Sequence, residues 1–230
     1  MIGEKFIKES SIKIDLKIEP AKFERVLKKS KLVPPIAEDF FIELITKRRS
    51  IREYTGDALS LEQLSFILYS ASSITGERLG QKLRTYPSAG AKYPIDIYVA
   101  IFNVDNLEPG IYKYNDVKFQ LELMAKGDFR EELYEICIEQ EFIKKASVLV
   151  ILVARSLRST YRYGERGIRY VLMDASYISS NIYLASTYLK LGSCVIGAFS
   201  DEGFKSFLNI KGDETFVVLA HAVGVIQNET

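Results

Sequence analysis

The most informative stretch of the chain is Arg84-Thr85-Tyr86-Pro87-Ser88-Ala89-Gly90-Ala91-Lys92-Tyr93-Pro94, which runs into Ile95-Asp96-Ile97-Tyr98-Val99-Ala100-Ile101. Proline, serine and glycine predict a turn, and the alternating apolar residues that follow predict a strand. Because its residues are small, the turn offers a hydroxyl, exposed backbone N–H groups and little side-chain bulk. A flat heteroaromatic ligand could therefore approach the main chain at this turn.

A second segment of interest is Arg48-Arg49-Ser50-Ile51-Arg52-Glu53-Tyr54, at the end of a helix predicted over residues 38–48. Its guanidinium groups match phosphate oxygens in a bidentate geometry, so the cluster could hold a phosphate dianion. The alternative is a solvated helix end whose cations complement the helix dipole. Together with the small-residue turn, the cluster indicates a phosphorylated, ring-bearing cofactor.

Length and composition favour one folded domain preceded by an arm. The chain has 230 residues, 47% of them hydrophobic, which is enough for one large core. Residues 1–35 are rich in Lys, Glu and Ile and end in Pro34-Pro35, so we expect an N-terminal arm, able to reach over a partner subunit, and a domain over 36–230. With 31 basic and 30 acidic residues, no overall field attracts nucleic acid or an anionic membrane.

Histidine and cysteine usage narrows the chemistry. His221 is the only histidine, which argues against Ser-His-Asp and Cys-His catalysis and against multi-histidine metal sites. Carboxylate-only metal sites survive this count, but we expect no metal. Cys137 and Cys194 lack the paired spacing of zinc or redox motifs, and we expect both to be reduced and buried. The first residues lack the apolar core of a signal peptide, and no apolar run approaches the roughly 18 residues that span a bilayer, which predicts a cytoplasmic location.

Hydrophobic periodicity predicts helices and strands in no strict alternation. Helical spacing predicts helices over 38–48, over 61–73 with Ser60 as N-cap, over 128–140 with Asp128 as N-cap, and over 168–191 with Gly192 as the C′ residue. Alternating or continuous apolar runs predict strands over 96–102, 111–114, 118–124, 147–154 and 215–226. We therefore expect an α+β domain with helices packed on a mixed sheet, the longest helix being central or a dimer seam.

At this point the chain resembles the FMN-dependent nitroreductase superfamily and, more narrowly, its SagB-type dehydrogenases, which include peptide thiazoline and oxazoline oxidases. The resemblance covers roughly residues 38–226 and rests on four segments in the family order. They are Arg48-Arg49-Ser50-Ile51-Arg52, Pro87-Ser88-Ala89-Gly90-Ala91-Lys92-Tyr93-Pro94, Tyr163-Gly164-Glu165-Arg166-Gly167-Ile168-Arg169-Tyr170 and Gly192-Ser193-Cys194-Val195-Ile196-Gly197-Ala198-Phe199.

The resemblance implies a nitroreductase-like α+β fold: a central mixed, largely antiparallel sheet flanked by helices, in an intertwined homodimer that binds FMN. Arg48, Arg49 and Ser50 would contact the flavin phosphate and ribityl chain, and Arg52 the N1 and C2-carbonyl edge of the ring. The turn of Pro87, Ser88, Ala89 and Gly90 would contact the flavin from the other subunit, unless it is an ordinary loop before a strand.

Further positions match the family around the ring. Backbone N–H groups of the segment Ile196, Gly197 and Ala198 would reach flavin N5 and O4. The alternative is that the segment is an ordinary turn that needs glycine for its conformation. Gln140 could bind the pyrimidine edge or lie at a solvated helix end. For Asn181 we favour a packing hydrogen bond over a ligand contact. Tyr163 is the one candidate for catalytic proton handling.

The chain also departs from the family. Azoline oxidases carry a Lys-Tyr pair where this chain has Arg162-Tyr163, and arginine cannot act as a general base. Ser176-Tyr177 replaces a Gly-His pair. No basic residue follows the last predicted strand, so the phosphate would rely on Arg48 and Arg49, with Arg166 or Arg169 as further candidates.

Three functional hypotheses remain open from the sequence, beside the alternative of an α+β domain that binds no flavin. The first is a homodimeric FMN oxidoreductase that passes hydride from NADH or NADPH to an electron-poor small-molecule or peptide acceptor. The second is a SagB-type dehydrogenase that oxidises a peptide azoline or similar substrate. The third is a flavin-binding subunit without turnover.

Overall fold

The structure, a computed structural model, describes residues 39–227. The arm predicted over 1–35 lies outside the described residues. The described chain is built on a six-stranded sheet and a separate two-stranded hairpin.

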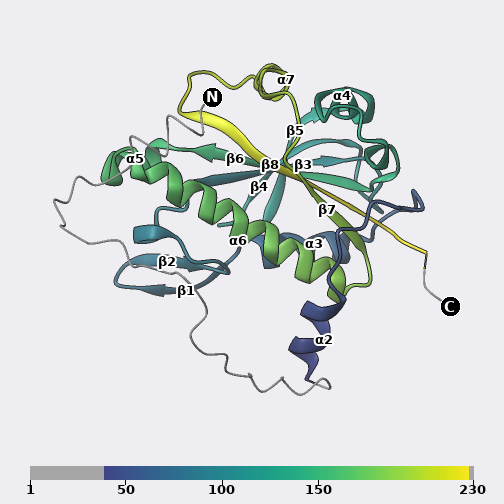
Figure 1. The fold of residues 1–230 in the computed structure, drawn as a ribbon, viewed down its shortest axis with the longest axis horizontal. Helices are drawn as coiled ribbons and strands as arrows, with labels where there is room; N and C mark the ends of the chain where they lie inside the picture. The colour runs from purple at the N-terminus through teal and green to yellow at the C-terminus, as the bar shows by residue number, and fades with distance from the viewer. Residues whose placement is uncertain (1–38, 228–230) are drawn as a thin grey trace, which may run out of the picture.

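The large sheet has the strand order β5-β4-β3-β6-β8-β7 and only antiparallel pairings (Figure 1). Its strands are β3 (Ile95–Ile101), β4 (Gly110–Asn115), β5 (Gln120–Lys126), β6 (Val148–Arg155), β7 (Gly192–Ile196) and β8 (Thr215–Gly224). The five strands predicted from the sequence are all present. The α+β fold with a largely antiparallel sheet flanked by helices is therefore confirmed.

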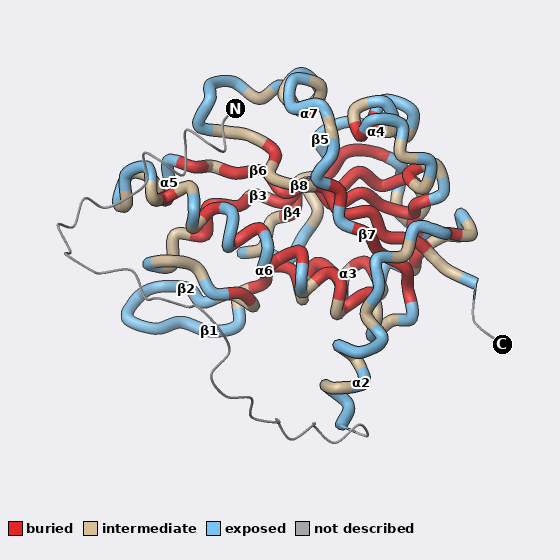
Figure 2. The backbone as a smooth tube through the Cα atoms, in the orientation of Figure 1, coloured by how far each residue is buried: buried red, intermediate tan, exposed pale blue. Residues whose placement is uncertain are grey.

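Helices cover both faces of the sheet because its central strands are apolar on both sides. Val148, Val150 and Leu152 of β6 pack in a cluster with α3 (Leu61–Ala71) and α6 (Arg166–Tyr188). Leu149 and Ile151 face the opposite cluster, which contains residues of α4 (Arg130–Ile136), the 3-10 helix η2 (Glu141–Lys145) and α7 (Asp201–Phe207). Figure 2 shows the buried strands between these layers.

The helix ends agree with the sequence in part. The predicted N-cap Ser60 is confirmed: its side chain accepts a hydrogen bond from the backbone N–H of Gln63, whose side chain completes a capping box. The prediction that Gly192 follows the long helix as C′ is wrong, because α6 ends at Tyr188 and Lys190 takes the left-handed conformation at φ 57°. Gly192 instead begins β7.

The helix predicted over 128–140 is also too long. The helix α4 covers Arg130–Ile136, and its N-cap is Phe129. Asp128 still accepts a hydrogen bond from the backbone N–H of Arg130 at 3.1 Å. The chain leaves the helix at Ile138 and Glu139, both with positive φ, and so brings Gln140 to the start of η2.

Several elements escaped prediction because they lack a long apolar pattern. They are α5 (Leu157–Tyr163), α7, β7 and the hairpin of β1 (Ile74–Arg78) and β2 (Gln81–Arg84). The hairpin is almost wholly exposed. It leads directly into the small-residue turn of 87–90. Within residues 39–227, no helix combines the length and apolarity needed to cross a bilayer.

Candidate active site

The arginine segment lies between α2 (Phe40–Lys47) and the edge of the sheet. Arg48 is the C-cap of α2, and the backbone N–H of Ile51 donates to the Ser193 carbonyl of β7 at 3.0 Å. This hydrogen bond fixes the segment along β7. Arg49 donates to the carbonyls of Thr46 and Arg48, both at 2.7 Å, as the helix-end alternative predicts.

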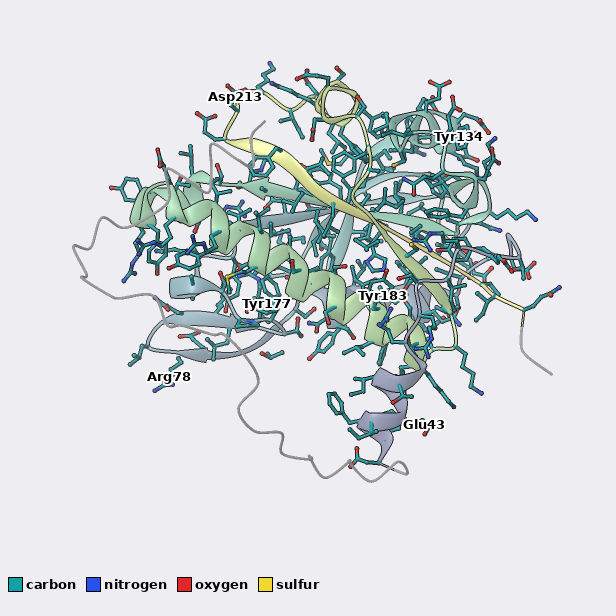
Figure 3. The ribbon with its side chains drawn as sticks, in the orientation of Figure 1. Glu43, Arg78, Tyr134, Tyr177, Tyr183 and Asp213 are labelled. Carbon is teal, nitrogen blue, oxygen red and sulfur yellow. The ribbon has the colours of Figure 1, made fainter. Side chains whose placement is uncertain are left out.

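Tyr183, near the end of α6, connects the segment to the fold (Figure 3). Its hydroxyl lies 2.8 Å from Ser50 Oγ and accepts a hydrogen bond from the Val195 backbone N–H at 2.9 Å. The Arg48 guanidinium lies over its ring, 5.1 Å from the centroid. The sequence analysis did not single out Tyr183; its only signal was a polar aromatic residue within the apolar stripe of a long helix.

The guanidinium groups of Arg48, Arg49 and Arg52 form no ion pair with a carboxylate among the described residues. Arg49 and Arg52 line a cavity of about 1550 Å³ together with Ile51, Phe142, Thr187 and the cations Lys47, Lys144, Lys145 and Lys190. Glu53 and Glu141 are its acidic residues, so cations outnumber acids there. Lys47 is paired with Glu43 at 2.6 Å and Lys144 with Glu141 at 3.3 Å. Arg49, Arg52, Lys145 and Lys190 have no carboxylate partner among residues 39–227, so a bound anion would neutralise positive charge in this cavity.

The segment of Ile196, Gly197 and Ala198 lies at the far end of β7 from Gly192. Ile196 is buried, whereas Gly197 and Ala198 are exposed, and a Cβ placed on Gly197 would meet nothing within 4 Å. Gln140 donates from Nε2 to the Ala198 carbonyl at 3.0 Å and to the Cys137 carbonyl at 2.9 Å. The structure thus brings Gln140 and Ala198 together beside open space, which a flat ring would fit.

The turn of Pro87–Gly90 leads into the 3-10 helix η1 (Ala89–Ala91). Ser88 Oγ accepts a hydrogen bond from the Tyr93 backbone N–H at 2.9 Å, which closes the turn. Gly90 has φ 59°, a conformation that favours glycine. A Cβ placed on Gly90 would lie 2.5 Å from the Tyr163 hydroxyl, so Tyr163 and the turn are in contact within one chain.

A buried carboxyl supports the turn from α6. Asp174 is only 2% exposed, and its carboxyl interacts with the Ser88 side chain, while its Oδ2 has no hydrogen-bond partner. Burial raises the pKa of Asp174 to about 6. The hydroxyl of Tyr86, beside the turn, is likewise buried without a partner, and burial raises the pKa of this phenol. Asp174 was not identified from the sequence.

The predicted cofactor residues form two groups in the structure. Arg48, Ser50 and Arg52 lie along β7 near Tyr183, on the same strand that leads to Gly197 and Ala198. The turn of 87–90 instead contacts Asp174 and Tyr163, and no hydrogen bond within 39–227 joins it to the first group. Asp174 and Tyr183 lie roughly 14 Å apart along the helix axis. Figure 1 shows α5 and α2 at opposite ends of α6.

The other residues singled out from the sequence lie on α6. Asn181 donates to the carbonyls of Ser70 at 2.9 Å and Thr85 at 3.3 Å, which confirms the predicted packing hydrogen bond. Arg166 and Arg169 lie at the start of α6, at the turn end of the helix rather than beside the arginine segment. Ser176 and Tyr177 are exposed on α6.

The histidine and the cysteines are buried. His221 Nδ1 lies 3.1 Å from Ser179 Oγ, and burial lowers the pKa of this histidine to about 3, which keeps its ring neutral. Cys137 and Cys194 are free and buried, as expected. Burial raises the pKa of Cys137 to about 12.

Comparison with known proteins agrees with this arrangement. The pattern of the family described as "Nitroreductase family" matches residues 45–225. MJ1384 of Methanocaldococcus jannaschii, a nitroreductase by name, is 38% identical over 179 residues, which are 78% of this chain and 89% of that protein.

Two further similarities are at lower sequence identity. The trifolitoxin operon protein TfxC of Rhizobium leguminosarum bv. trifolii is 24% identical over 220 residues, 86% of this chain but only 62% of TfxC. The structure of the E. coli microcin synthetase McbBCD complex with truncated pro-MccB17 bound matches with a TM-score of 0.70 at 19% identity, covering 97% of this chain and 87% of that one. The McbBCD match shows the fold alone, while the similarity to TfxC supports the SagB-type branch. The extent of the family match shows that the chain belongs to the Nitroreductase family.

Proposed function

We propose that this chain is a homodimeric, cytoplasmic FMN-dependent oxidoreductase that passes electrons from NADH or NADPH to an electron-poor acceptor. The main observation behind the proposal is that a cluster of arginines and an open stretch of backbone lie near opposite ends of β7. Three guanidinium groups without carboxylate partners lie toward one end, and the unobstructed backbone of Gly197 lies at the other. A phosphate and a flat ring on one extended ligand would match both ends.

The residues have distinct parts in this proposal. Arg48 and Arg49 would hold the phosphate, with Ser50 on the adjoining chain. Arg52, whose guanidinium lies 6.0 Å from the Phe142 ring centroid, would place a positive charge beside the ring. Backbone N–H groups of Gly197 and Ala198 would stabilise negative charge on the ring, and Gln140 would hold their segment through the Ala198 carbonyl. Bound FMN would supply the redox chemistry itself.

The separation of the turn of 87–90 from the arginine segment supports a composite site between two copies of the chain. The turn would then serve the cofactor of the partner copy. Apolar side chains exposed along α2, α3 and α6 offer a surface for such a dimer: Phe40 62%, Phe41 58%, Phe66 41%, Leu172 45%, Met173 43% and Tyr188 51% exposed.

A second candidate is a SagB-type dehydrogenase that oxidises a peptide azoline or similar substrate. The similarity to TfxC and to the McbBCD complex with its bound peptide favours it. Arg162 counts against it, because a guanidinium is protonated at any working pH and cannot abstract a proton. Tyr163, in contact with Gly90, is the remaining proton-handling group in either function.

The test is an anaerobic titration of the FMN-loaded protein with NADH and then NADPH, followed by the flavin absorption spectrum. Bleaching by either donor supports the first function and identifies the donor. Bound flavin that no donor bleaches favours the substrate-oxidising function or a subunit without turnover. If the protein does not bind FMN at micromolar concentration, the proposal is wrong.

Variants test the phosphate site in the same titration. Arg48→Ala should weaken FMN binding about tenfold or more, because a charge-assisted hydrogen bond to phosphate is lost. Arg78→Ala is the matched control, since Arg78 is exposed on the β1–β2 hairpin and points away from the body of the protein in Figure 3. The control should leave the FMN dissociation constant unchanged.

A further inference from the structure

Two hydrogen-bond donors at the end of α5 face the small-residue turn. A Cβ placed on Gly90 would lie 2.5 Å from the Tyr163 hydroxyl and 3.5 Å from Nη1 of Arg162. A side chain at position 90 would have to displace the phenol, and the positive φ of Gly90 also disfavours other residues. Whatever approaches the turn therefore also meets Arg162 and Tyr163.

Neither donor is used within the described chain. Arg162 is exposed, and its guanidinium makes only a contact over the Tyr163 ring, 5.5 Å from the centroid. Arg158, one turn earlier on the same helix, offers a contrast, because it is paired with Asp96 at 2.7 Å. Arg155 is paired with the same carboxylate at 3.1 Å. Asp96 thus neutralises Arg155 and Arg158, whereas Arg162 has no carboxylate partner among residues 39–227.

The surroundings of Arg162 keep the local charge positive. Arg166 follows at the start of α6 and has no carboxylate partner among residues 39–227. Lys92 lies just after the turn. Glu165 is the acid nearest in sequence, and it is exposed and forms no ion pair with any described residue. Asp174 is the acid that contacts the turn, but it is buried, whereas Arg162 is exposed. An anionic group that approaches the turn from solvent would therefore meet Arg162, which has no ion-pair partner among residues 39–227.

We propose that Arg162 and Tyr163 form a binding site for an oxyanion of the substrate, which makes the preferred acceptor a carboxylate-bearing compound. The guanidinium can donate two parallel hydrogen bonds to a carboxylate, and the phenol can donate a third. The inference rests on the proposed function, in which the turn of 87–90 faces the flavin of the partner copy. It assigns Arg162, which cannot serve as a base, to substrate selection.

The experiment uses a matched pair of acceptors with the FMN-loaded enzyme: 4-nitrobenzoate, which carries a carboxylate, and the neutral 4-nitrobenzamide. Donor oxidation gives kcat/KM for each acceptor in the wild type and in Arg162→Gln. The ratio of benzoate to benzamide should fall about tenfold or more in the variant, chiefly through KM, because one charge-assisted contact is lost. The two acceptors differ in intrinsic reactivity, but this difference is the same for both enzymes. It therefore cancels when the benzoate-to-benzamide ratio of the variant is divided by that of the wild type.

A binding measurement gives a readout that does not depend on turnover. Calorimetric titration of unreactive benzoate into the FMN-loaded protein should show weaker binding in Arg162→Gln, with partial retention in Arg162→Lys. Tyr163→Phe should weaken benzoate about threefold, as expected for one neutral hydrogen bond. Arg78→Gln, on the exposed hairpin, should change neither the ratio nor benzoate binding.

Two outcomes would overturn the inference. One is a ratio and a benzoate affinity in Arg162→Gln equal to those of the wild type. The other is a raised FMN dissociation constant in that variant, which would make Arg162 a cofactor residue. Failure of the proposed function looks different, since the wild type itself would then bind no FMN or reduce neither acceptor, and the inference would fall with it.

Discussion

At the residue scale, the glycines near the two ends of β7 differ in what surrounds them. Gly197 has open space and no positive φ, so Gly197→Val should fold with a melting temperature close to that of the wild type. If the flavin ring lies there, the valine blocks it, and FMN affinity should fall by well over tenfold. Calorimetry of the apoprotein and FMN titration measure the two effects separately.

Gly192→Ala provides the opposite control. Its Cβ would lie 2.5 Å from Cγ2 of Ile226 and 2.9 Å from the Tyr54 ring, so the substitution should lower the free energy of unfolding by about 1–3 kcal/mol. A valine at 197 that leaves FMN affinity unchanged would mean that the ring lies elsewhere.

Asp174 should make folding stability depend on pH. Its pKa is raised from 3.8 to about 6 in the folded protein. Below both pKa values the carboxyl is protonated in the folded and the unfolded protein, so it does not change the free energy of unfolding. As the pH rises from 4 through 6, the unfolded chain releases the proton first, and the free energy of unfolding falls by roughly 3 kcal/mol in total.

Asp174→Asn removes this dependence while it keeps an oxygen that can accept from Ser88. Urea unfolding of both proteins between pH 4 and pH 7.5 measures the difference. The variant should gain stability relative to the wild type as the pH rises, and the two pH profiles should converge near pH 4. Parallel profiles would show that the carboxyl ionises in the folded protein at its ordinary pKa.

At the element scale, Asn181 holds α6 to two neighbours. Its Nδ2 donates to the carbonyl of Ser70 in α3 and to that of Thr85, which follows β2. Asn181→Ala would leave these carbonyls without this donor, so the free energy of unfolding should fall by about 1–3 kcal/mol. FMN affinity should stay unchanged if the role is packing alone.

Ser180→Ala is the matched control for Asn181, because Ser180 is exposed on the same helix. It should leave stability within about 0.5 kcal/mol of the wild type. A loss of FMN affinity in Asn181→Ala without a loss of stability would contradict the packing role and favour a ligand contact.

At the scale of the whole molecule, the composite site predicts that cofactor binding requires two copies of the chain. Met173 is 43% exposed on α6, and Met173→Glu would place a charge on the proposed dimer surface. Sedimentation velocity should then show a monomer, and FMN titration should show weakened binding, because the turn of 87–90 is supplied by the partner.

Val117→Glu is the control for the dimer prediction, since Val117 is 55% exposed in the turn between β4 and β5. It should remain dimeric and bind FMN as the wild type does. A monomeric Met173→Glu protein with full FMN affinity would disprove the composite site, and a dimeric one would place the dimer surface elsewhere.

Sequence patterns determined the elements with long apolar runs and the segments that carry unusual chemistry. The continuous apolar run of β6 predicted a strand covered on both faces, because each face needs apolar side chains. The cap at Ser60 and the helix-end position of Arg48 also follow from local rules. The hairpin of β1 and β2 did not, because its exposed strands lack apolar alternation.

Tertiary structure alone decided which segments meet. Neighbours far apart in the chain are set by packing, so no local pattern placed Ser50 and Val195 on the hydroxyl of Tyr183, or Ser88 on Asp174. The same holds for Gly192, whose place at the start of β7 was settled when Lys190 took the left-handed position instead. The sequence by itself determined the kinds of groups available, arginines for an anion and small residues for a flat ring. The arginines and the Gly197 segment lie along β7, and the turn of 87–90 lies away from them, because of long-range contacts that only the folded chain provides.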